Sequence, residues 1–116
     1  FDALLADYAA AGLTETAAVV PILTAQAEHL LRAGRAGEAA AAARQARENG
    51  LDQLPPGHFQ TAFATAALAR ALSAEGRGSE AGDLAGAAWS TLVPLFGADD
   101  PRLNGLRALI EDEELA

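Results

Sequence analysis

The chain has 116 residues, of which 51% are hydrophobic but only 5% are aromatic, so its apolar side chains are mostly alanine and leucine. That length suits one domain, and alanine has the highest helix propensity, which favours an all-α fold. The formal net charge is −8, and this disfavours nucleic acid as a partner because phosphate contacts need clustered basic side chains. Cysteine is absent, which excludes disulfides and thiol chemistry.

No apolar run approaches the roughly 20 residues that a membrane-spanning helix needs, and nothing resembles a signal peptide. We therefore expect a cytoplasmic protein without a membrane partner. All eight basic residues are arginine, and arginine without lysine in a chain rich in alanine and glycine is typical of a GC-rich bacterial genome. Because the chain begins at Phe1 rather than at methionine, we expect it to belong to a longer protein.

Apolar residues spaced three and four apart predict helices, in chain order, at residues 2–11, 15–33, 36–49, 58–75, 78–96 and 101–114. Pro21 indicates that the second helix begins near residue 20, and Pro94 should kink or end the fifth, because proline lacks the N–H that a helix interior needs. Asp99 or Asp100 can cap the last helix, with Pro101 in its first position.

A Gly-Arg-x-x-Glu-Ala signal occurs twice, beginning at Gly34 and at Gly76, 42 residues apart. Each glycine separates two helical patterns, so each copy predicts a helix, a tight turn with positive φ and a second helix. A hairpin cannot bury its apolar face alone, so the copies should stack around a shared core. Small residues stand where the helices are expected to cross closely: Ala27, Ala39, Ala46, Ala69, Ala81 and Ala88.

The segments LARALSAEGRGSEA (68–81) and LFGADDPRL (95–103) resemble the tetratricopeptide repeat, in the 42-residue variety found in kinesin light chains and many bacterial signalling proteins. The pattern departs from the family at Ala43 and Ala85, where large aromatic residues are usual, and at Phe59, where proline is expected. The resemblance implies a right-handed stack of antiparallel helical hairpins with about six helices.

The likeness covers about residues 20–110. The whole chain is expected to form one domain, with a partial repeat at 1–14, repeats at 15–57 and 58–100, and a C-terminal capping helix at 101–116. In this family the first helix of each hairpin lines a concave groove, so the resemblance implies a protein–protein interaction module within a larger signalling or regulatory protein.

Projecting the helical period onto the first helices places eight residues on the groove side: Thr24, Glu28, Leu31, Arg32, Phe63, Ala67, Arg70 and Ser73. Relatives that grip the terminal carboxylate of a peptide use lysine and asparagine in the groove. This chain has no lysine, and Asn49 and Asn104 stand at helix ends, so that mode is not expected. The alternative is a structural dimerisation or spacer domain of a regulator or kinase, without a peptide ligand.

No pattern of catalytic, cofactor-binding or metal-binding residues is evident, so we expect neither an enzyme nor a cofactor. His29 and His58 are far apart in the sequence, and capping or surface roles suit them better than metal binding. The acidic run at residues 111–114 is typical of a solvated helix end. The spacing of Gly82 and Gly86 indicates close helix packing.

Two repeats and two partial ones leave little chain to cover the outer helices, so we expect an end helix to meet a second copy of the chain or a missing part of the parent protein. The apolar side chains that the two end helices offer are Leu4, Leu5, Tyr8, Leu103, Leu106, Leu109 and Ile110.

Overall fold

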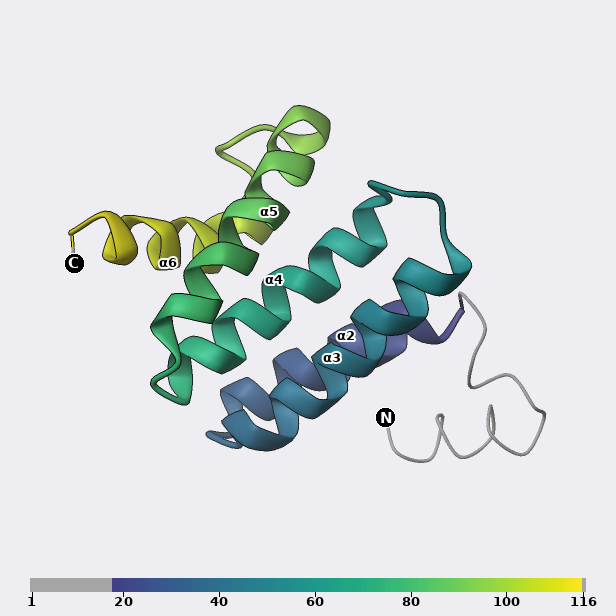
Figure 1. Cartoon of the computed structure of the whole chain (residues 1–116), viewed down its shortest axis with the longest axis horizontal. Helices are drawn as coiled ribbons and strands as arrows, with labels where there is room; N and C mark the ends of the chain where they lie inside the picture. Colours follow the sequence, from purple (N-terminus) through teal and green to yellow (C-terminus); the bar gives the residue numbers. More distant parts are fainter. Residues whose placement is uncertain (1–17, 116) are drawn as a thin grey trace.

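The computed structural model describes residues 18–115, which form five α-helices and one short 3-10 helix (Figure 1). The elements are α2 (Val19–Arg32), α3 (Ala36–Gln53), α4 (Phe59–Ala74), α5 (Gly78–Phe96), η1 (Pro101–Leu103) and α6 (Asn104–Leu115). This part of the chain contains no strand, and the prediction of an all-α fold is confirmed. The helix predicted at 2–11, with Leu4, Leu5 and Tyr8, lies outside the described residues.

The two prolines lie near helix ends. α2 begins at Val19, so Pro21 stands in its first turn. Backbone N–H groups in a first turn have no partner within the helix, so proline costs no hydrogen bond there. α5 runs through Pro94 and ends two residues later at Phe96, and Gly97 follows with a φ of 88°. α3 continues to Gln53, four residues beyond its predicted end.

The two repeated glycines close the turns between helices, as the sequence predicts. Gly34 has a φ of 77° and Gly76 a φ of 83°. In each turn the arginine after the glycine donates its backbone N–H over 2.9 Å to a carbonyl five residues earlier, that of Leu30 in the first turn and of Leu72 in the second. This Schellman pattern needs a residue with positive φ, which glycine adopts without strain.

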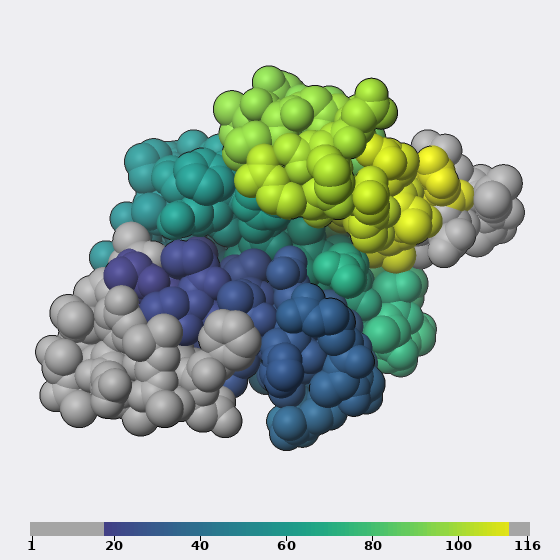
Figure 2. Space-filling view, turned by 180° about the vertical axis from the view of Figure 1, so that it is seen from behind, coloured from purple at the N-terminus to yellow at the C-terminus, as the bar shows by residue number. Residues whose placement is uncertain are grey.

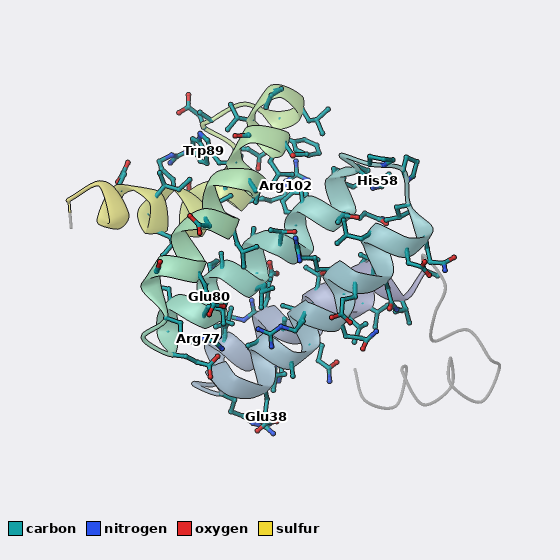
Figure 3. The ribbon with its side chains drawn as sticks, in the orientation of Figure 1. Glu38, His58, Arg77, Glu80, Trp89 and Arg102 are labelled. Carbon is teal, nitrogen blue, oxygen red and sulfur yellow. The ribbon has the colours of Figure 1, made fainter. Side chains whose placement is uncertain are left out.

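The rest of the repeated signal also acts within the turns. Arg35 forms an ion pair with Glu38, and Arg77 forms one with Glu80, three residues further along in each case. These side chains are exposed, so each pair contributes little to stability. Figure 3 shows Glu38, Arg77 and Glu80 at the end of the stack opposite His58. The repeated signal therefore specifies hairpins and does not form the groove described below.

α4 is the central helix of the stack (Figure 1): it packs against its chain neighbours α3 and α5, and also against α2 and α6. α4 thus lies beside α2, the first helix of the preceding hairpin, and also beside α6. No Cα atoms of the second helices, α3 and α5, come within 8 Å of each other. Because the first helices approach one another and the second helices do not, the stack curves with α2, α4 and α6 on its inner side.

Small side chains fill the positions where helices cross. All six alanines predicted there are at most 1% exposed: Ala27, Ala39, Ala46, Ala69, Ala81 and Ala88. Ala43 and Ala85 are also fully buried. Alanine at a crossing lets helix axes approach to the lower end of the usual range, about 8–10 Å.

The expectation of close helix packing at Gly86 is wrong. Gly86 is exposed, and a Cβ added to it would meet no atom within 4 Å, so it does not serve close helix packing. Leu103, Leu106 and Leu109 are buried inside the chain, because this side of α6 packs against α4 and α5. These three leucines are therefore not available to a second copy; Ile110 is partly buried against the same core.

We expect Gly76→Ala to lower the free energy of unfolding by roughly 1 kcal/mol, because alanine is strained at its positive φ. Gly86→Ala is the matched control: it lies inside α5 with open space around it, and should raise stability by up to about 1 kcal/mol. Urea denaturation followed by circular dichroism measures both. Similar changes in unfolding free energy for the two substitutions would contradict the positive φ of Gly76.

We expect Gly50→Ala to destabilise the chain by about 1–3 kcal/mol through overpacking between α3 and α4. A Cβ at Gly50 would press on the Thr61 hydroxyl and lie only 3.1 Å from the Thr61 Cβ. That hydroxyl has no hydrogen-bond partner among the described residues, so Thr61→Ala should be mild alone and should recover part of the loss in the double variant. Additive effects in the double-mutant cycle would contradict the close approach.

Candidate functional site

A groove of about 550 Å³ lies on the inner side of the stack, between α2, α4 and the segment formed by η1 and the start of α6. Figure 2 faces this side of the molecule, with α2 in purple below and the η1–α6 segment in lime and yellow above. Its lining residues are Pro21, Thr24, Ala25, Glu28, Phe59, Gln60, Phe63, Arg70, Pro101, Arg102 and Gly105.

Four of the eight residues predicted from the helical period line this groove: Thr24, Glu28, Phe63 and Arg70. The other four do not. Arg32 and Ser73 stand at or near the ends of their helices, beyond the reach of the groove, and Leu31 is half-buried against the core. Ala67 is only 1% exposed and belongs to the core of the stack.

Most of the lining residues, including most that the prediction missed, lie at positions related by the 42-residue repeat. Nine of the eleven lining residues fall into sets separated by the 42-residue repeat: Pro21, Phe63 and Gly105; Glu28 and Arg70; Phe59 and Pro101; Gln60 and Arg102. Equivalent positions of successive repeats therefore build the groove. Applying the 42-residue offset to the predicted positions would have found Pro21 and Gly105, because the offset locates equivalent positions even where the residue types differ.

Three phenylalanine rings pack into an aromatic wall, and two of them, Phe59 and Phe63, line one end of the groove. The rings of Phe59, Phe63 and Phe96 lie with their centroids 5.7 to 6.4 Å apart, mostly edge to face. His58 stacks on Phe59 at 4.6 Å, and its Nδ1 caps α4 by accepting a 3.1 Å hydrogen bond from the backbone N–H of Gln60. Phe59 remains 39% exposed, so the wall presents part of an aromatic ring to a ligand.

Arg102 is held in place beside this wall (Figure 3). Its guanidinium lies 4.3 Å from the centroid of Phe96 and 5.4 Å from that of Phe63, within the range of cation–π attraction. Its Nε and Nη2 donate to the two carboxylate oxygens of Asp100 at 3.0 and 2.8 Å. Asp100 also caps η1 by accepting the backbone N–H of Arg102 at 2.9 Å, as the sequence predicts.

Arg70 differs from Arg102 in forming no ion pair among the described residues. It is half-buried on α4, and its side chain extends over the backbone of α6 at Gly105. A Cβ at Gly105 would lie 2.9 Å from the Arg70 Nε and 3.1 Å from its Cζ. Within the part of the chain that the structure describes, neither the side chain of Arg70 nor that of Glu28, on the facing helix α2, forms a hydrogen bond or an ion pair. As far as the described residues go, the groove thus carries one cation and one anion that form no ion pair.

No protein-family model matches the chain, and no curated protein or solved structure is significantly similar to it. Among the side chains that the structure describes, those of residues 18–111, no group of three or more histidine and acidic residues could hold a metal ion. No helix within those bounds is long and apolar enough to cross a membrane. The function is therefore inferred from the groove.

The Asp100–Arg102 pair should make stability depend on pH in the acidic range. The hydrogen bonds from the Arg102 side chain and backbone lower the pKa of Asp100 from 3.8 to about 2. A lowered pKa in the folded state means that the stabilisation is complete above about pH 4 and is lost as the pH falls through about 2. Asp100→Asn keeps an acceptor for the cap but has no charge to lose.

We expect the stability difference between the unsubstituted chain and Asp100→Asn to be constant near neutral pH and to shrink between about pH 4 and pH 2. Thermal unfolding at a series of pH values measures this difference. A difference that is unchanged at pH 2 would contradict the pairing.

Proposed function

We propose that the chain is a tetratricopeptide-like interaction module that holds a segment of another protein in the groove between α2, α4 and α6, as part of a larger cytoplasmic regulatory or signalling protein of a bacterium. The observation that supports this proposal is the repetition of the lining residues every 42 positions. A surface built from equivalent positions of stacked hairpins is continuous along the stack, which suits an extended or helical segment.

The dimensions of the groove fit a short segment. On α4 its lining residues run from Phe59 to Arg70, a distance of about 16 Å at 1.5 Å per residue. About five residues of extended chain cover that distance. The volume of about 550 Å³ is within the usual range for ligand sites.

The chemistry of the lining also favours binding. The aromatic wall offers an apolar surface for a large side chain of the partner, and the far end offers the charges of Glu28 and Arg70. Apolar anchors with a few polar contacts are typical of segment recognition. Glu28 is the single carboxylate among the lining residues, and they include no histidine, so the groove does not pair an acid with a base for proton transfer.

The proposal predicts that peptides selected from a random library displayed on phage bind the groove. Binding of a selected peptide should weaken about tenfold with Phe59→Ala, because exposed aromatic anchors carry much of the energy of such interfaces. Leu51→Ala is the matched control: Leu51 is also a large exposed side chain, at 60%, but does not line the groove. Isothermal titration calorimetry measures both affinities.

Two results would contradict the proposal. The first is that Phe59→Ala and Leu51→Ala leave peptide affinity equally unchanged. The second is that no peptide is enriched while light scattering shows a stable dimer that Phe59→Ala disperses, which would favour a structural dimerisation domain without a peptide ligand.

A further inference from the structure

The guanidinium of Arg70 is the group in the groove that most needs a partner. A half-buried guanidinium loses part of its hydration, and it has five N–H donors to satisfy. Arg102 lines the same groove, but both of its charge-assisted hydrogen bonds go to Asp100. Arg70 has no such carboxylate within the described chain. An anion from a bound partner would therefore accept the hydrogen bonds that its guanidinium can donate.

The absence of a Cβ at Gly105 leaves the room that the Arg70 side chain occupies. The side chain of Arg70 passes so close to α6 that a Cβ at Gly105 would lie 2.9 Å from Nε. Any residue other than glycine would therefore push the guanidinium away from its present position. Gly105 stands 42 residues after Phe63 and 84 after Pro21, at the equivalent position. Where those two residues have a larger side chain, Gly105 leaves space that the Arg70 side chain occupies.

We propose that the segment bound in the groove carries one aspartate or glutamate side chain that pairs with Arg70, close to a large apolar side chain that packs on Phe59 and Phe63. The inference rests on the proposed function and adds the chemistry of the partner. A carboxylate side chain can turn both oxygens onto one guanidinium, in the bidentate arrangement that makes such pairs strong.

The charges around Arg70 favour a single carboxylate over an acidic tract or a phosphate group. The chain has a net charge of −8, and Glu28 lines the same groove, so each further negative charge on the ligand would be repelled. The one hydroxyl among the lining residues, that of Thr24, already donates to the Val20 carbonyl at 2.9 Å. Arg70 is therefore the group that receives the anion, and one carboxylate balances it.

The test uses a synthetic peptide from the phage selection, together with a version in which its acidic residue is replaced by the matching amide. We expect the acidic peptide to bind about ten times more tightly than the amide version. Arg70→Gln should remove that difference. Arg44→Gln, at an exposed position on α3 outside the groove, should preserve it.

Gly105→Ala gives a second test that changes no charge. Its Cβ should displace the guanidinium, which is the flexible end of a side chain, so the chain should fold with an unchanged or higher melting temperature. The affinity for the acidic peptide should nevertheless fall toward that for the amide version. Unchanged affinity would show that Arg70 does not receive the carboxylate where the structure places it.

The outcomes separate this inference from the proposed function. The inference is overturned if the selected peptides lack an acidic residue. It is also overturned if Arg70→Gln and Arg44→Gln lower peptide affinity equally. In either case the groove remains a binding site if Phe59→Ala still weakens peptide binding. Binding that is abolished by amidation of the peptide's C-terminus also overturns it, because the carboxylate then comes from the chain end. Peptides that are indifferent to Phe59→Ala overturn both.

Discussion

The close approach of helices through alanine is the constraint on which the rest of the structure depends. α4 contacts four other helices, and six of its alanines are buried on several sides: Ala62, Ala64, Ala66, Ala67, Ala69 and Ala71. An alanine contributes little buried area, so a helix of this composition is stable only when it is covered on most sides. Four neighbouring helices provide that cover, and their packing brings α2 and α6 to the same side of α4.

That packing also explains where the large side chains lie. Because alanine and leucine fill the core, the phenylalanines at 59, 63 and 96 stand at its edge, where they form the aromatic wall and where Phe59 and Phe63 line the groove. Arg102 fixes this wall by lying against two of its rings while Asp100 holds the guanidinium. A wall that is ordered before binding loses less conformational entropy when a ligand arrives. The two arginines of the groove thus differ in role, since Asp100 fixes Arg102 while Arg70 has no ion-pair partner among the described residues.

Features set by local backbone chemistry could be predicted from the sequence. The turns at Gly34 and Gly76 need positive φ, and the Asp100 cap depends on residues only two positions apart. The groove could be predicted only in part, because Arg102 and Gly105 belong to a third segment that the sequence identifies as a cap. Gly86 likewise could not be placed from the sequence. Its spacing from Gly82 suggests close packing, but the side of α5 that faces the core is decided by its contacts with α4 and α6.

The most direct test of the groove as a binding site is to follow the amide signals of the isotope-labelled chain by NMR during titration with a selected peptide. Changes should concentrate on the groove sides of α2 and α4 and on residues 101–105, with the largest near Phe63 and Arg70. Signals from the exposed faces of α3 and α5 should stay in place. Changes that instead centre on α3 and α5 would show that the partner binds the outer side of the stack, and would contradict the function proposed for the groove.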